Sequence, residues 1–332
     1  MEVGILAVPW PGRTGTTARL LEELGFDTVL FPDSQNLAPE VWGQLMVAAG
    51  TTSRVRLGPG VTNPVTRDVA VTASAALALQ AESGGRVLLG IGRGDSSVQR
   101  IGRREERVAA FEGHLEALQR YLRGESVDRG GFASRLEWLE RLELPKVPLE
   151  VAATGPRVIA AAARRAERVC LAVGADPAHV AATLAVAREA AAGRSVQLGA
   201  FVNVVVDDDV AAARDAVRGS ATSFARFSAF AGSDLARLPA PLAAAARWIR
   251  AHYDMRNHTR TNVPHTAGID DAFVDWFAVA GPPAVARERL TALAALGLDF
   301  VHVIPGSTGM PRALAASSIQ RLATEVLPAL RG

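Results

Sequence analysis

Short apolar runs alternate with longer Ala-, Leu- and Arg-rich segments along most of the chain. The short runs are apolar at nearly every position, which is typical of strands buried on both faces of a parallel sheet. The segments between them carry apolar residues at helical spacing, and several begin at proline or end at glycine. The predicted strands are 3–8, 27–31, 55–61, 86–91, 149–153, 169–173, 196–206 and 300–304. The predicted helices are 14–24, 39–49, 67–81, 104–123, 156–166, 177–192, 210–219, 284–296 and 313–330.

Eight strands, most of them followed by a helix, predict an α/β fold of the (β/α)8 TIM barrel type. The alternative is a doubly wound open sheet, in which a glycine fingerprint would follow the first strand. The sequence there is Pro-Trp-Pro-Gly at 9–12, which does not match. Two stretches interrupt the alternation: 124–148, predicted as a surface excursion, and 220–280. We expect residues 1–332 to form a single barrel domain, with 220–280 as an insertion that covers the C-terminal mouth.

Composition narrows the classes of function. The chain has 332 residues, of which 49% are hydrophobic, so a large core is expected. Lys and Arg number 36 against 34 Asp and Glu, a near balance that argues against a nucleic-acid surface. The single cysteine, Cys170, lies in an apolar run and is predicted as a core residue, so neither a disulfide nor a metal site is expected. No signal-peptide pattern and no apolar stretch of ~18 residues is present, which predicts a cytoplasmic protein without a membrane partner.

Candidate functional residues lie where predicted strands end, because barrel enzymes carry their chemistry at the C-terminal ends of the strands. Strand 55–61 is broken by the sequence Gly-Pro-Gly, which indicates a bulge where a flat ligand approaches bare backbone, or an ordinary loop. Gly155 precedes a helix opened by Pro156. That arrangement suits a phosphate group, and equally a plain helix start.

Two acids, Asp33 and Asp95, also follow predicted strands. Each can accept hydrogen bonds from a ligand or cap the following helix. Within the insertion, His252, Tyr253 and His258 are candidates for a group that protonates a substrate. The alternative is that the aromatic side chains of this segment only pack a small core of their own.

Three stretches in order resemble the bacterial-luciferase-like superfamily, and most of all its branch related to methylenetetrahydromethanopterin reductase. They are LGPGVTNPVTR at 57–67, RVLLGIGRGD at 86–95 and AATGPR at 152–157. FAVAG at 277–281 also resembles this family. The resemblance covers nearly the whole chain. It implies a barrel with an insertion over its mouth, use of the deazaflavin coenzyme F420 and assembly as a homodimer.

The resemblance also implies where the coenzyme would bind. A bulge with a non-prolyl cis peptide bond at Gly60–Val61 would press against the middle of the tricyclic ring. The implied contacts are Asp33, Thr62 and Asn63 around the ring, Gly92, Arg93, Gly94 and Asp95 beside the ring and its side chain, and Thr154, Gly155 and Pro156 at the phosphate, with Arg157 as a charge partner.

The implied activity is that of an oxidoreductase, with hydride transfer between coenzyme F420 and a small organic substrate that has a C=C, C=N or alcohol/carbonyl group. One alternative is a monooxygenase that uses reduced FMN and oxygen. Another is a flavin-binding protein without catalytic activity. The sugar-phosphate dehydrogenases of the superfamily have histidine directly after the acid that ends strand two, whereas here Ser34 follows Asp33. Glucose 6-phosphate is therefore not the expected substrate.

Overall fold

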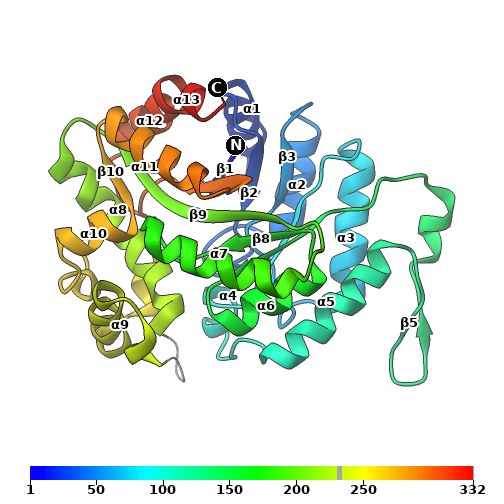
Figure 1. Cartoon of the computed structure of the whole chain (residues 1–332). Coiled ribbons are helices and arrows are strands. Elements are labelled where there is room, and N and C mark those ends of the chain that lie inside the picture. The colour runs from blue at the N-terminus through cyan, green and yellow to red at the C-terminus, as the bar shows by residue number, and fades with distance from the viewer. Residues whose placement is uncertain (230–233, 332) are drawn as a thin grey trace.

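The chain folds into a nearly closed barrel of parallel strands, seen in a computed structural model that describes residues 1–229 and 234–331 (Figure 1). The strand order is β3-β2-β1-β11-β9-β8-β7-β4. The two end strands of this path meet through the isolated bridges Leu57–Val87 and Thr62–Ile91. The barrel strands are β1 (Glu2–Leu6), β2 (Thr28–Phe31), β3 (Arg56–Pro59), β4 (Leu89–Ile91), β7 (Leu149–Ala153), β8 (Arg168–Leu171), β9 (Gln197–Val206) and β11 (Phe300–Ile304). The predicted (β/α)8 barrel is confirmed, and the open sheet is excluded.

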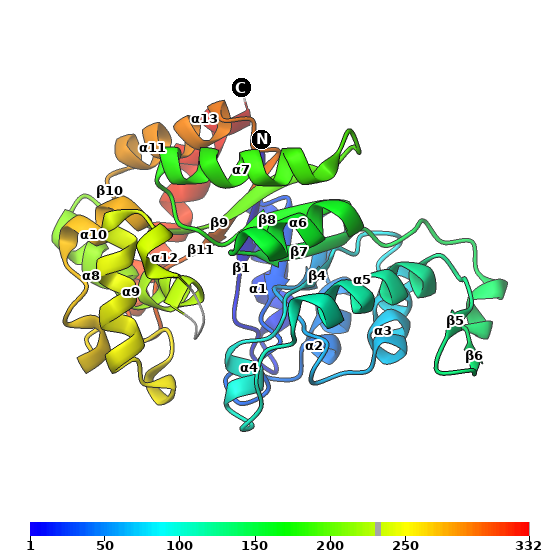
Figure 2. The ribbon, with the colours of Figure 1, turned by 60° about the horizontal axis from the view of Figure 1, so that its bottom comes forward.

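Helices surround the barrel and connect its strands (Figures 1 and 2). Aspartate side chains cap four of them, Asp68 at α3, Asp176 at α7, Asp209 at α8 and Asp270 at α10, by accepting a hydrogen bond from a backbone N–H of the first turn. The helices are α1 (Thr14–Glu23), α2 (Val41–Ala49), α3 (Val69–Glu82), α4 (Ser96–Gln99), α5 (Val108–Leu122), α6 (Pro156–Arg165), α7 (Pro177–Ala191), α8 (Val210–Ala225), α9 (Ala240–His252), α10 (Asp271–Phe277), α11 (Pro283–Ala295), α12 (Arg312–Arg321) and α13 (Leu327–Arg331). None of the described helices is long and apolar enough to cross a membrane.

The insertion is more regular than the sequence suggested. Helix α8 continues to Ala225, and α9, α10 and the short strand β10 (Val279–Gly281) follow it. Apolar side chains of α8, α9 and α10, among them Leu242, Ile249 and Phe273, form a hydrophobic core separate from the main one. These three helices lie together at one side of the barrel (Figure 2). The insertion is therefore a small packed unit rather than an irregular loop.

Two other segments depart from the simple alternation. Residues 124–148 contain the hairpin of β5 (Val127–Asp128) and β6 (Ala133–Ser134), which projects from the barrel in Figure 2, as expected for a surface excursion. Helix α5 begins at Val108 rather than at 104, because Arg93 and Glu106 exchange hydrogen bonds that hold the preceding residues as a loop against the end of β4.

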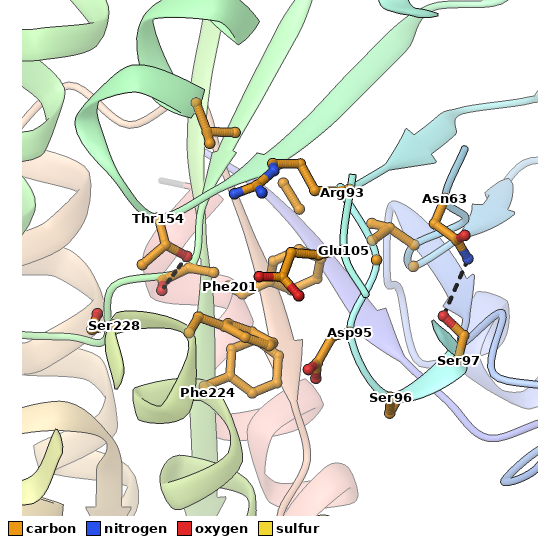
Figure 3. Close-up of a pocket in the computed structure, with 18 of the residues that line it drawn as sticks. Asn63, Arg93, Asp95, Ser96, Ser97, Glu105, Thr154, Phe201, Phe224 and Ser228 are labelled. Atoms are coloured by element: carbon orange, nitrogen blue, oxygen red, sulfur yellow. Dashed lines mark hydrogen bonds between the residues drawn. The ribbon is translucent and has the colours of Figure 1, made fainter. Parts of the chain in front are cut away.

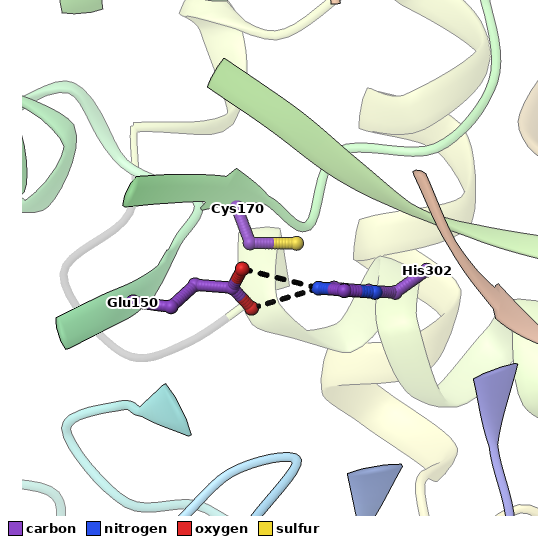
Figure 4. A group of neighbouring side chains, drawn as sticks. All are labelled: Glu150, Cys170 and His302. Atoms are coloured by element: carbon purple, nitrogen blue, oxygen red, sulfur yellow. Dashed lines mark hydrogen bonds and ion pairs between the residues drawn. The ribbon is translucent and has the colours of Figure 1, made fainter. Parts of the chain in front are cut away.

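The barrel interior holds a buried polar cluster, in which Glu150, Cys170 and His302 point toward one another from β7, β8 and β11 (Figure 4). The Glu150 carboxylate accepts hydrogen bonds from His302 Nε2 and Arg168 Nε, both at 2.9 Å. Burial alone would raise the pKa of Glu150, but the contacts with His302 and Arg168 outweigh it and lower that pKa. Cys170 is fully buried, which confirms it as a small core residue, and this burial raises the pKa of its thiol.

Candidate active site

A cleft of about 1790 Å³ opens at the C-terminal end of the barrel, between the strand ends and the insertion (Figure 3). Every residue that the resemblance assigns to the coenzyme lines this one cleft. These are Asp33, Gly60, Val61, Thr62, Asn63, Gly92, Arg93, Gly94, Asp95, Thr154, Gly155, Pro156 and Arg157.

The end of β3 is held by hydrogen bonds to neighbouring strand ends. The peptide bond between Gly60 and Val61 is cis, as the resemblance implied. The buried Thr62 hydroxyl donates to Asp33 Oδ2 at 2.7 Å, and Arg67 Nε lies 3.4 Å from the same oxygen. Asn63 Nδ2 donates to Ser97 Oγ at 3.1 Å. Asp33 thus ties β2 to β3 at the cleft and does not cap a helix.

The glycines of the motifs serve two different purposes. A Cβ atom at Gly60 would lie 2.8 Å from Leu30 Cβ and 2.8 Å from Leu6 Cδ1. Glycine at 60 is therefore required by the packing of the barrel itself, while Gly60 also lines the cleft. A Cβ atom at Gly155 would meet no heavy atom within 4 Å. The backbone φ angle of −85° also permits any residue, so neither packing nor backbone conformation requires glycine here. The space at Gly155 remains open toward the cleft.

The start of α6 offers free backbone donors. Gly155 is the N-cap residue and Pro156 occupies the first turn, with no side chain capping the helix. The backbone N–H groups of Gly155 and Arg157 have no hydrogen-bond partner within the described part of the chain. The exposed Arg157 side chain lies beside them and adds positive charge. Unpaired N–H groups at a helix N-terminus, together with a cation, suit a phosphate group.

An ion pair joins the insertion to the barrel across one end of the cleft. Asp95, at the end of β4, pairs with Arg226, which directly follows α8. Arg226 also donates to Gln99 Oε1 at 2.7 Å, and Arg100 Nη1 donates to the Met255 carbonyl at 2.5 Å. The Asp95 side chain does not cap α4. Its carboxylate holds the insertion in place, a contact that no local sequence pattern predicts.

Two of the three candidate proton donors meet at the cleft. His258 lines the cleft, and its Nδ1 atom lies 2.6 Å from the hydroxyl of Tyr253, which packs behind it. Burial lowers the pKa of His258 to about 4, with Arg226 and Arg100 contributing, and burial raises the pKa of Tyr253 to about 12. Both side chains are therefore neutral near pH 7. His252 is exposed, stacks on the Trp248 ring at 3.8 Å and lies outside the cleft.

The sequence did not single out the apolar floor of the cleft. Phe201 of β9 and Phe224 of α8 lie close together in Figure 3, with ring centroids 5.8 Å apart. The ring centroid of Phe227 lies 5.3 Å from that of Phe224. Glu105 also lines the cleft, and its carboxylate has no hydrogen-bond partner among the residues described (Figure 3). Phe201 lies in a strand whose residues are nearly all apolar, so its sequence position does not distinguish it from a core residue. Glu105 lay in the predicted helix 104–123 and was not singled out.

Comparison with known proteins identifies the family. Residues 7–299 match the family model of luciferase-like monooxygenases. The chain belongs to this family. It is 28% identical to a 5,10-methylenetetrahydromethanopterin reductase of Archaeoglobus fulgidus over 94% of both chains. It is 31% identical to the reductase of that name from Methanolobus tindarius, over 60% of this chain and 64% of that protein.

Solved structures agree with the luciferase-like fold. The coenzyme F420-dependent tetrahydromethanopterin reductase of Methanopyrus kandleri superposes with a TM-score of 0.77 at 23% identity, over 98% of each chain. An F420-dependent secondary alcohol dehydrogenase superposes with a TM-score of 0.75 at 17% identity, over 100% of this chain and 99% of that one. This luciferase-like chain is therefore an oxidoreductase whose homologues include F420-dependent reductases and dehydrogenases.

Proposed function

We propose that this luciferase-like enzyme transfers hydride between coenzyme F420 and a small organic substrate bound beneath the insertion. The observation that carries the proposal is the single cleft that gathers every implied coenzyme residue and ends at the open N-terminus of α6. The similar proteins whose names include F420, among them a tetrahydromethanopterin reductase and dehydrogenases, support the choice of coenzyme.

The residues present fit such a coenzyme. The unpaired N–H groups at Gly155 and Arg157 and the open space at Gly155 suit its phosphate. Thr62, Asn63 and the Gly92–Asp95 stretch line the part of the cleft expected for the ring. When bound, the deazaflavin would supply a carbon atom that accepts or donates hydride.

The substrate would occupy the side of the cleft formed by the insertion. Phe201, Phe224 and Phe227 offer it an apolar surface that excludes water, and His258 offers a neutral hydrogen-bonding group. This combination suits a molecule with an apolar body and a polar reacting end. Incubating the enzyme anaerobically with reduced F420 and a panel of carbonyl, imine and enone compounds tests this proposal. Substrate-dependent loss of the reduced coenzyme supports it, and no loss with any compound counts against it.

The second candidate is a monooxygenase that uses reduced FMN and oxygen. It is favoured by the family's description as luciferase-like monooxygenases. A monooxygenase of Streptomyces bottropensis also shares the fold with a TM-score of 0.68. Deazaflavin has carbon where FMN has the nitrogen N5, so the coenzyme separates the two reactions. Oxygen uptake that requires reduced FMN would select the monooxygenase.

We also propose a homodimer. Leu20, Val47 and Val71 lie on the successive outer helices α1, α2 and α3, and each is about half exposed. Apolar side chains exposed in one region of a surface favour contact with a partner. Light scattering coupled to gel filtration measures the mass directly, and a mass near that of one chain would reject the dimer.

A further inference from the structure

A chain of hydrogen bonds leads from the interior of the insertion to the cleft. Ser223 of α8 is buried, and its hydroxyl lies 3.0 Å from the Gly219 carbonyl and 2.8 Å from the Tyr253 hydroxyl. The backbone N–H of Thr259 donates to the same serine oxygen at 3.0 Å. The Tyr253 hydroxyl in turn lies 2.6 Å from Nδ1 of His258.

Counting the available hydrogens gives this chain a direction. If Ser223 donates its one hydrogen to the Gly219 carbonyl, its oxygen accepts from both Thr259 and Tyr253. The Tyr253 hydroxyl then donates its hydrogen to Ser223 and accepts a hydrogen bond from Nδ1–H of His258. In this arrangement the contacts of Ser223 with Gly219, Thr259 and Tyr253 and the contact of Tyr253 with His258 are all hydrogen bonds. In the reverse direction Ser223 donates to Tyr253, Tyr253 donates to Nδ1, and the contact with Gly219 is lost. The first arrangement makes one more hydrogen bond.

We propose that Ser223 and Tyr253 are positioning residues that hold the hydrogen of His258 on Nδ1, so that Nε2 is the atom that exchanges a proton with the substrate. Nε2 has no hydrogen-bond partner in the described ranges 1–229 and 234–331, and His258 lines the cleft. The role of Nε2 in a reaction rests on the proposed function. The position of the hydrogen on Nδ1 of His258 does not depend on that function.

An Nε2 atom without hydrogen can accept a proton, which favours substrates that lose one from oxygen or nitrogen when they are oxidised. Such substrates are alcohols, which become carbonyl compounds, and amines, which become imines. In alcohol oxidation the C–H bond would break, and its hydrogen would leave with both electrons as hydride to a bound oxidised deazaflavin. The O–H bond breaks, its proton goes to Nε2, and the C=O double bond forms. The substrate is oxidised and the coenzyme is reduced, and reduction of the carbonyl follows the same steps in reverse.

Charged and titratable groups from several elements face His258. Asp95, at the end of β4, favours the imidazolium form. Arg226, Arg100 and His265 disfavour it, and together with burial they keep the resting ring neutral. The neutral ring leaves Nε2 free to take a proton during the reaction, and Asp95 would then stabilise the resulting charge.

The chain offers a matched pair of tyrosines for the test. Tyr253 stacks on His265 at 4.4 Å and lies under Arg226 at 4.8 Å, so Tyr253→Phe keeps the ring in place and removes only the hydroxyl. Tyr121, the other tyrosine, bonds to Ser134 at 2.8 Å, outside the cleft. Tyr121→Phe removes an equivalent hydroxyl and serves as the control.

The direct measurement is NMR of the coenzyme-free protein with 15N-labelled histidine near pH 7, with His258→Gln used to assign the signals. We expect Nδ1 of His258 to carry the hydrogen and Nε2 to be bare. Tyr253→Phe should populate the other tautomer, whereas Tyr121→Phe should leave the signals unchanged. Hydrogen on Nε2 in the parent protein, or no change in Tyr253→Phe, would overturn the proposal.

Kinetics provide the second readout. Tyr253→Phe should lower kcat at least tenfold, with KM for the substrate and Kd for the coenzyme nearly unchanged, because the hydroxyl acts only through His258. Tyr121→Phe should retain the parent kcat. An unchanged kcat in Tyr253→Phe contradicts the positioning role. Failure of the parent to bind F420 rejects the proposed function, while the NMR result still decides the tautomer.

Discussion

Gly155→Ala is the substitution that separates coenzyme binding from folding most cleanly. The new methyl group meets no heavy atom within 4 Å, and the backbone at φ −85° and ψ 151° is open to alanine, including before a proline. Alanine is a poorer N-cap residue than glycine, so the free energy of unfolding should fall by about 1 kcal/mol. The methyl group instead enters the open space at Gly155, where the start of α6 lines the cleft.

The expected loss of affinity follows from those N–H groups. A hydrogen bond to a charged phosphate contributes about 1.5 to 3 kcal/mol, and a helix N-terminus adds a smaller amount. Displacing the phosphate from one such donor should cost about 2 kcal/mol, which corresponds to an increase of about 30-fold in Kd for F420.

The assay is a titration of parent and variant with F420, together with chemical denaturation of both. Gly113→Ala is the control, because Gly113 lies within α5, also meets nothing within 4 Å and does not line the cleft. It should stabilise the protein by up to about 1 kcal/mol and leave Kd unchanged. An unchanged Kd in Gly155→Ala would refute the placement of the phosphate at α6.

Three further predictions follow from the same contacts. Gly60→Val should destabilise the barrel itself, because its Cβ would meet two leucine side chains at 2.8 Å; denaturation at the parent midpoint would contradict this. Asp95→Asn should lower the free energy of unfolding by about 2 to 3 kcal/mol, because it removes the carboxylate that pairs with the mostly buried Arg226. Asp208→Asn, at the exposed carboxylate that pairs with Arg321, should lower it by less than about 1 kcal/mol. Equal losses in the two variants, measured by denaturation, would argue against a stabilising role for the Asp95 contact. Burial lowers the pKa values of His114 and His258 to about 4 in the folded protein. Between pH 6.5 and 4 the unfolded chain therefore binds more protons than the folded protein. As the pH falls through this range, the free energy of unfolding should decrease by up to about 3 kcal/mol for each histidine. His114→Leu should remove the part of this pH dependence that comes from His114. If the slope of unfolding free energy against pH is the same in parent and variant, the lowered pKa of His114 is rejected.

The barrel was predictable because each strand is buried on both faces and therefore reads as an apolar run. Val29, Leu57 and Val169 face the surrounding helices, whereas Leu30 and Cys170 face the barrel interior. The regular structure of the insertion was not predictable in the same way. Helices α9 and α10 bury their apolar faces mainly against α8 and against each other, and α9 begins without a capping side chain.

The candidate site was predictable as far as parallel topology determines it. Residues that end neighbouring strands must lie close together, so Asp33, Thr62 and Gly155 could be assigned to one cleft from their positions along the chain. Contacts across the cleft could not be assigned. Asp95 and Arg226 are 131 residues apart, and Ser223 acquires a role only because α8 packs behind Tyr253.

The most direct test of the central claim is a binding titration of the purified protein with coenzyme F420 and, separately, with FMN. We predict saturable binding of F420 with a Kd much lower than that for FMN, and an increase of about 30-fold in the Kd for F420 when Gly155 is replaced by alanine. Tight binding of FMN with weak binding of F420 would contradict the proposed hydride-transfer function and move the enzyme to the oxygen-dependent branch of its family.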